Sequence, residues 1–230
     1  YIPNNVSSNT PVVFNIHGGG RDGDSTRNMM INKAEQYGFI IIAPEFTSSN
    51  FPGGDGFNLG NVYLDGDNPT TGSLNEVNEW AFSIIEPIFD VFLANTNTNV
   101  DKYHLFGHSA GAQFIHRYML LSNDYRISNT VIANAGWYTF LNGSKFPYGI
   151  KDKPINISSE RVRWFMSSKT NLLIGDSDVG LQSLNTSKGA MRQGNNRLER
   201  ANNYFSSLIL LGEENKIPFR WNFHLIKGVA

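Results

Sequence analysis

Short apolar runs alternate with longer amphipathic segments along the whole chain, and this alternation restricts the possible folds more than any other feature. Several runs are apolar at nearly every position, as strands buried on both faces of a parallel sheet are. The predicted strands are PVVFNIHG (11–18), GFIIIAPEF (38–46), KYHLFGHS (102–109), NTVIANAG (129–136), NLLIGDSD (171–178) and RWNFHLIKG (220–228). The segments between them predict helices at 25–36, 74–94, 110–121, 159–167 and 196–211. This order predicts a three-layer α/β/α sandwich with a mostly parallel sheet.

The chain has room for one sizeable domain. Its 230 residues are 40% hydrophobic and 17% charged, which is typical of a globular protein. No linker, break in composition or internal repeat divides residues 1–230, so we predict a single α/β domain. The first residues, YIPNN, already have the character of domain sequence. We therefore expect the natural protein to have some further N-terminal sequence and a short C-terminal tail.

Residues 46–73 are the least regular part of the sequence. Their Gly, Asp and Asn content predicts a long loop, and a loop of this length is uncommon without a function. It is either a surface excursion or one wall of a substrate cleft. The carboxylates between residues 53 and 67 do not have the spacing of a calcium-binding loop, so we expect no metal site there.

Composition argues against several classes of protein. The net charge is −1 and no basic run is present, which disfavours nucleic-acid binding. The absence of cysteine excludes a thiol nucleophile, disulfides and cysteine-type zinc sites. No run of about 18 apolar residues predicts a membrane span.

The strongest chemical motif is LFGHSAG (105–111), in which Gly107, Ser109 and Gly111 form G-x-S-x-G. An apolar strand precedes the motif and a helical pattern follows it, which is the context that the motif requires. A serine on such a sharp turn has a strained backbone, and the flanking glycines avoid clashes. The turn directs the N-terminus of the next helix towards the reacting centre. The motif therefore predicts a nucleophilic serine.

A second motif, NIHGGGRDGD (15–24), follows the first predicted strand. Glycines let the backbone approach a substrate closely, and their N–H groups can bind the negative charge that develops on a carbonyl oxygen. We predict that Gly19 and Gly20 form such an oxyanion hole together with the N–H of Ala110. His17 is expected to brace this loop through hydrogen bonds.

The two motifs, in this order and with this strand pattern, resemble the α/β-hydrolase superfamily over nearly the whole chain. The segments NAGWYTF (134–140), GDSDVG (175–180) and QGNNRLER (193–200) are similar to a bacterial branch of secreted serine esterases. That branch is related to polyhydroxyalkanoate depolymerases and to feruloyl and acetyl-xylan esterases. The resemblance implies a Ser–acid–His triad in that chain order and no metal or organic cofactor. It also implies a secreted or periplasmic protein.

The resemblance implies where the acid lies. The family pattern places it three residues after the glycine of GDSD (175–178), which selects Asp178. Asp176 is the fallback. A buried carboxylate at this position would orient the histidine ring and stabilise its charged form.

The base is expected in the loop after the last strand, directly after a GVG or GVA turn. That turn is Gly228–Val229–Ala230 here, so we expect the triad histidine to be the residue that follows Ala230. His224 is the fallback, and a natural protein without the base is a third possibility. Four histidines precede the acid and break the family order. They are His17, His104, His108 and His116.

Two further groups of residues attract attention. Trp137 and Tyr138 follow the C-terminal end of a predicted strand, where open α/β sheets bind ligands, so they are candidate substrate contacts. Simple packing is an equal alternative. Arg197 and Arg200 lie three residues apart on one predicted helix face, which we interpret as a solvated face.

The sequence thus predicts a serine esterase that acts on a small-molecule or polymeric ester. Two alternatives stay open. One is a related hydrolase of amide or peptide bonds, and the other is a non-enzymatic binding protein on the same fold.

Overall fold

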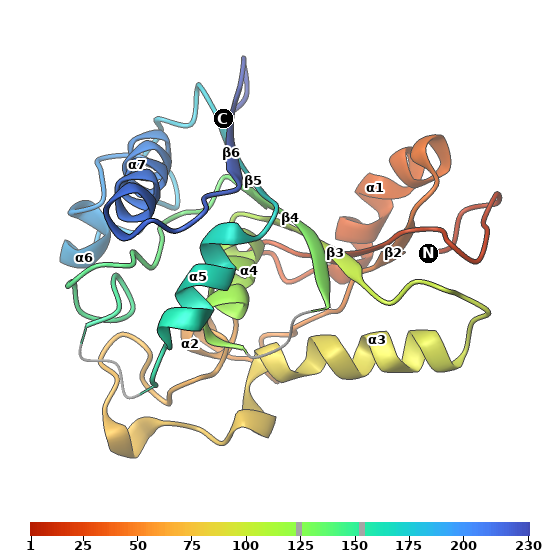
Figure 1. Ribbon diagram of the computed structural model, residues 1–230, viewed down its shortest axis with the longest axis horizontal. Helices are drawn as coiled ribbons and strands as arrows, with labels where there is room; N and C mark the ends of the chain where they lie inside the picture. Colours follow the sequence, from red (N-terminus) through yellow and green to blue (C-terminus); the bar gives the residue numbers. More distant parts are fainter. Residues whose placement is uncertain (123–125, 152–154) are drawn as a thin grey trace.

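The computed structural model describes residues 1–122, 126–151 and 155–230 (Figure 1). In this part of the chain, six strands form one sheet in the order β2-β1-β3-β4-β5-β6, and every neighbouring pair is parallel. Each strand overlaps one predicted apolar run, which confirms the α/β class. The strands are β1 (Val12–Ile16), β2 (Ile40–Ile42), β3 (Tyr103–His108), β4 (Ile127–Ala133), β5 (Thr170–Gly175) and β6 (Trp221–Ile226).

Helices lie on both faces of this sheet (Figure 1). On one face is α1 (Gly23–Tyr37), where the side chain of Asn15 in β1 donates to the Thr26 carbonyl at 2.8 Å. On the other face, aromatic rings join helices to strands, as between Phe89 and Tyr103 at 5.0 Å. The helices of that face are α3 (Ile85–Ala94), α4 (Ala110–Leu121), α5 (Ser159–Ser167) and α7 (Arg197–Asn215). The shorter helices are α2 (Gly53–Gly56), η1 (Thr71–Ser73) and α6 (Lys188–Met191). None of the helices in the described residues has the length and apolar character needed to span a bilayer.

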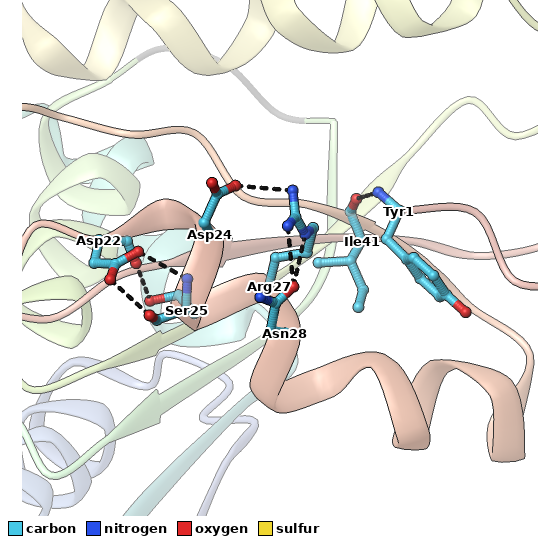
Figure 2. Close-up of polar contacts among 8 residues, drawn as sticks. Tyr1, Asp22, Asp24, Ser25, Arg27, Asn28 and Ile41 are labelled. Atoms are coloured by element: carbon cyan, nitrogen blue, oxygen red, sulfur yellow. Dashed lines mark hydrogen bonds and ion pairs between the residues drawn. The ribbon is translucent and has the colours of Figure 1, made fainter.

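The start of α1, directly after the glycine-rich loop, is fixed by an N-cap (Figure 2). Asp22 accepts hydrogen bonds from the backbone N–H and the hydroxyl of Ser25 at 2.7 and 2.6 Å. Such a cap satisfies N–H groups that have no partner inside the helix. On the neighbouring edge of the sheet, the amino group of Tyr1 donates to the Ile41 carbonyl at 2.8 Å. The glycine-rich loop is therefore held between a strand of the sheet and a capped helix.

The predicted helix over 74–94 is not continuous, and this prediction is wrong. Two short 3-10 turns, η2 (Val77–Glu79) and η3 (Ala81–Ile84), precede α3. Trp80 between them is extended, with φ −68° and ψ 138°. Pro87 lacks the N–H that a continuous helix would bond to the carbonyl four residues earlier, and its ring would clash there. A regular helix can therefore begin only within a turn of Pro87.

The predicted loop 46–73 packs against the helix that follows Ser109. Phe46 and Phe57 are buried, and their rings lie 4.9 and 5.6 Å from the ring of Phe114 in α4. This burial favours a structured wall beside the elbow over a solvated excursion.

The turn between β3 and α4 presses against the end of β1. A Cβ atom built on Gly111 would lie 2.2 Å from the Ile16 carbonyl oxygen and 2.6 Å from that of His17. A Cβ atom on Gly107 would lie 2.5 Å from the carbonyl oxygen of Gly111. Both glycines of the motif are thus required by close backbone contacts. The same contacts bring the glycine-rich loop next to the Ser109 turn.

Gly111→Ala is expected to lower the free energy of unfolding by about 3 kcal/mol or more, because the added methyl group meets backbone carbonyls in a packed core. Gly72→Ala is the matched control, since no atom lies within 4 Å of a Cβ there. Urea unfolding of the two variants measures the difference. Equal losses would show that the close approach is not required.

Candidate active site

Ser109 lies on the turn between β3 and α4, where the sequence places it. Its φ of 54° and ψ of −114° belong to a region that side chains rarely adopt. Its backbone N–H donates to the Ala133 carbonyl at 2.9 Å, which ties the turn to β4. A Cβ atom built on Gly18 would lie 3.7 Å from the Cβ of Ser109. The glycine-rich loop therefore borders the serine directly.

The predicted oxyanion donors are neighbours in sequence of Gly18 and Ser109, the two residues that meet at this point. Gly19 and Gly20 are exposed, and open space lies around a Cβ built on either residue. A ligand can therefore approach their backbone closely. Ala110 is the first residue of α4, so its N–H belongs to the helix end where N–H groups lack intrahelical partners. Their role as oxyanion donors stays a prediction.

His17 is buried and held in one tautomer. Its Nε2 accepts a hydrogen bond from the Phe46 N–H at 2.9 Å, so Nδ1 carries the proton and donates to the Gly18 carbonyl at 2.9 Å. Burial lowers the pKa of His17, which favours the neutral ring that this arrangement needs. The predicted bracing role of His17 is confirmed by these contacts.

Arg21 is a site residue that the sequence analysis missed. It ends the glycine-rich loop in a left-handed conformation, with φ 57°. Its guanidinium donates to the carbonyl oxygens of Phe46, Phe51 and Gly53 at 2.7, 2.9 and 2.6 Å, and lies 4.2 Å from the centre of the Phe57 ring. One side chain thus fastens residues 46–73, which we call the wall segment, to the glycine-rich loop. Its polar partners are 25 to 32 residues away, so no local pattern reveals them.

The structure distinguishes the two carboxylates after β5. Asp178 is buried and accepts a hydrogen bond from the side-chain amide of Asn134 at 2.8 Å. Asp176 instead accepts from the Gly228 N–H at 2.8 Å and so braces the end of the chain. Asn134 directly follows Ala133, whose carbonyl accepts from the Ser109 N–H at 2.9 Å, so the hydrogen bond from Asn134 holds Asp178 near the elbow. These placements favour Asp178 as the acid, and they reveal Asn134 as a second residue that the sequence analysis missed.

Arg197 and Arg200 do not form a solvated face, and that interpretation is wrong. Arg197 forms an ion pair with Asp178 at 3.2 Å, and only 15% of its side chain is exposed. Arg200 is fully buried and donates to the carbonyl oxygens of Gly136 and Asn185, each at 2.8 Å. Loops fold over the first turns of α7, and their buried carbonyl groups need donors.

The remaining histidines do not complete a triad. His224 is exposed on β6, and its Nε2 contacts the side-chain oxygen of Asn171 at 2.9 Å. Asn171 lies at the start of β5, whereas Asp178 follows its end, so the structure does not bring His224 to the acid. His116 is fully buried, and its Nε2 accepts from the Thr139 N–H at 3.0 Å.

Trp137 and Tyr138 differ in their surroundings. Tyr138 is fully buried and stacks on Tyr204 of α7 at 4.4 Å, which favours packing, the alternative that the sequence left open for it. Trp137 keeps 5% of its surface exposed. Its ring lies between the guanidinium of Arg117, at 4.0 Å, and the ring of Tyr148, at 4.7 Å. A role for Trp137 at the substrate stays a prediction.

No family model matches the sequence, and a search of curated proteins finds no match. The structure is similar to poly(aspartic acid) hydrolase-1 from Sphingomonas sp. KT-1, with a TM-score of 0.91 and 32% identity, covering 100% of this chain and 86% of that one. It is also similar to a poly(3-hydroxybutyrate) depolymerase from Bordetella parapertussis, with a TM-score of 0.91 and 27% identity, covering 100% and 76%. Carboxyl esterase 2 from Tuber melanosporum shares the fold, with a TM-score of 0.56 and 14% identity, covering 96% and 69%.

The lowered pKa of His17 predicts a pH dependence of stability. The unfolded chain takes up a proton at a higher pH than the folded protein, whose ring stays neutral. The contribution of His17 is therefore fully present above about pH 6.5 and is lost as the pH falls through the folded pKa, by up to about 1.4 kcal/mol per pH unit. His17→Gln, whose side-chain oxygen can accept from Phe46, is expected to reduce this slope. Urea titrations between pH 7.5 and 5 measure how the free energy of unfolding changes with pH in the unsubstituted protein and in the variant. The same slope in both proteins would contradict the prediction.

Arg21→Met is expected to lower the free energy of unfolding by about 2–3 kcal/mol, because the part-buried carbonyl groups of Phe46 and Phe51 lose a charged donor. Arg27→Met is the matched control on α1. Arg27 pairs with exposed Asp24, and such a surface pair contributes at most about 1 kcal/mol. Thermal and urea unfolding compare the two. If Arg27→Met lowers the free energy of unfolding as much as Arg21→Met does, Arg21 has no special role in anchoring the wall segment to the glycine-rich loop.

Proposed function

Because this chain belongs to the α/β-hydrolase superfamily, we propose that it is a serine hydrolase that cleaves a carboxylic ester through an acyl-enzyme on Ser109. The observation that carries the proposal is the strained Ser109 turn, with the backbone of Gly18 beside it and buried Asp178 near the same edge of the sheet. The two solved structures with a TM-score of 0.91 are both hydrolases, which supports the proposal.

The reaction follows from the roles of these groups. The Ser109 hydroxyl attacks the ester carbonyl and gives its proton to the base, while the carbonyl oxygen becomes an oxyanion. The N–H groups of Gly19, Gly20 and Ala110 bind that oxyanion, and one such donor contributes roughly 3–4 kcal/mol. The base returns the proton to the leaving alcohol. Water then attacks the acyl-enzyme by the reverse sequence and releases the acid.

Asp178 orients the base in this proposal, and the base is the residue that follows Ala230. The geometry of the preceding turn supports this assignment. The Val229 carbonyl accepts a hydrogen bond from the Ser177 N–H at 2.9 Å, and a Cβ atom on Gly175 would lie 3.2 Å from the Ala230 nitrogen. The turn therefore lies against the segment that leads into Asp178.

A second candidate is the hydrolysis of an amide bond by the same groups. It is favoured by the similarity to a poly(aspartic acid) hydrolase, whose named polymer is joined by amide bonds. The chemistry at Ser109 would be unchanged except for the leaving group, which is then an amine. Turnover of a matched ester and anilide of the same acyl group separates the two candidates.

The full-length protein is expected to gain one adduct when a fluorophosphonate probe reacts with Ser109, as read by intact-mass spectrometry. Ser109→Ala should give no adduct and lower kcat on p-nitrophenyl butyrate by roughly 10⁴–10⁶-fold. Ser49→Ala, at an exposed position in the wall segment, is the control and should label normally. A full-length protein that neither labels nor hydrolyses the ester would favour a non-enzymatic role for the fold.

A further inference from the structure

A hollow of about 150 Å³ lies between the segment after Trp137 and the short helix α6. We call it the side hollow. Its polar lining comes from Asn142, Ser144, Lys145, Tyr148, Arg192 and Gln193. A second hollow adjoins it and shares Lys145, Tyr148, Gly189 and Arg192. The proposed reaction at Ser109 assigns no role to these residues.

The wall of the side hollow is built from fixed groups. The Tyr148 ring packs on Trp137 at 4.7 Å, and its hydroxyl is 2.7 Å from the hydroxyl of Ser187. A Cβ atom built on Gly189 would lie 2.2 Å from the Tyr148 ring, so a side chain at that position would displace the ring. The shape of the hollow therefore depends on Gly189 and on the Tyr148 ring, which is held by Trp137 at its face and by Ser187 at its hydroxyl.

Positive charge dominates this hollow. Lys145 and Arg192 are exposed, and among the described residues neither has an ion-pair partner. Among the residues that the structure describes, no carboxylate lines the side hollow itself. Asp67 lines the adjoining hollow, where it is the acidic member of the wall. Two unpaired cations in one concave site are suited to binding an anionic group.

Two buried cations lie behind the aromatic wall. Arg117 and Arg200 are fully buried, and the hydrogen bonds described for them end on neutral acceptors, such as the Thr139 hydroxyl and the Gly136 carbonyl. Burial lowers the pKa of Arg117 to about 9, which leaves it largely protonated at neutral pH. Charges in a dry interior are screened less than surface charges, so they strengthen the positive potential on this side of the site.

The side hollow is linked to the proposed reacting groups by a short stretch of chain. Asn134, which holds Asp178, lies three residues before Trp137. A Cβ atom on Gly136 would lie 2.9 Å from the side-chain nitrogen of Gln113, and Gln113 is one helical turn after Ser109. The stretch from Asn134 to Trp137 therefore joins the residue that holds Asp178 to the residue that supports the aromatic wall of the hollow.

We infer that the side hollow binds a carboxylate carried by the substrate, through Lys145 and Arg192, and thereby selects acidic chains over neutral ones. The inference rests on the proposed hydrolysis at Ser109, because it assigns the hollow to the same substrate. It adds a substrate class, a chain bearing carboxylates away from the scissile bond, which the reaction chemistry alone does not specify.

The test measures binding separately from turnover. The full-length Ser109→Ala protein is titrated calorimetrically with an aspartate decamer and with a glycine–serine decamer of the same length. The aspartate decamer is expected to bind more tightly, and added salt should weaken it. Adding Lys145→Gln and Arg192→Gln together should weaken the aspartate decamer by about tenfold or more. The control pair is Lys102→Gln with Arg220→Gln. Both are exposed cations that directly precede β3 and β6, so they lie at the amino-terminal ends of the strands, away from the carboxyl ends that carry the proposed site.

Two results would overturn the inference. One is equal affinity for the two decamers, and the other is an equal loss in both double variants, which would indicate general attraction to surface charge. Thermal melting shows whether all variants are folded. Failure of the proposed function is read separately, because it would appear as the absence of fluorophosphonate labelling in the unsubstituted protein. Labelling of Ser109 without preference for the aspartate decamer would reject the side hollow alone.

Discussion

The backbone of Gly111 lies against the carbonyl oxygens of Ile16 and His17, and the arrangement of the site depends on this contact. It joins the turn that carries Ser109 to the loop that carries the proposed oxyanion donors. No side chain fits between the two segments, so their separation is set by backbone atoms of Gly111 in the first turn of α4 and of Ile16 and His17 at the end of β1. A separation fixed by backbone atoms suits a site whose groups have to be held in place for the transition state.

Polar side chains hold the loops around this backbone contact in place. His17 and Arg21 fasten the wall segment near Phe46 to the glycine-rich loop. On the other side of the site, Gln193 both accepts from the Tyr138 N–H at 2.9 Å and donates to the Tyr138 carbonyl at 2.6 Å. Backbone groups buried in irregular segments lack the partners that helices and strands provide, and these side chains supply them. The loops at the carboxyl ends of the strands are thereby held in one conformation.

Much of the fold follows from local patterns in the sequence, whereas burial of individual side chains does not. Apolar runs located all six strands because a strand buried on both faces needs them. The helix predicted over 74–94 failed because Pro87 limits where a regular helix can begin. Arg200 was misassigned, and the surroundings of Tyr138 could not be decided, because the partners of both residues come from distant parts of the chain. Asn134 escaped notice because its partner, Asp178, lies 44 residues away.

The segment after β4 connects the proposed chemistry to the proposed selectivity. Asn134 at its start holds Asp178, and Trp137, three residues later, supports the Tyr148 wall of the side hollow. A substrate group bound in the hollow is therefore positioned relative to the acid by one buried stretch of chain. The two similar structures with a TM-score of 0.91 carry the names of hydrolases of an acidic polymer and of a neutral polyester. Since the fold is common to both, we attribute preference between such polymers to side chains around the site, and the side hollow that we propose for this role contributes Lys145 and Arg192, which have no ion-pair partner among the described residues.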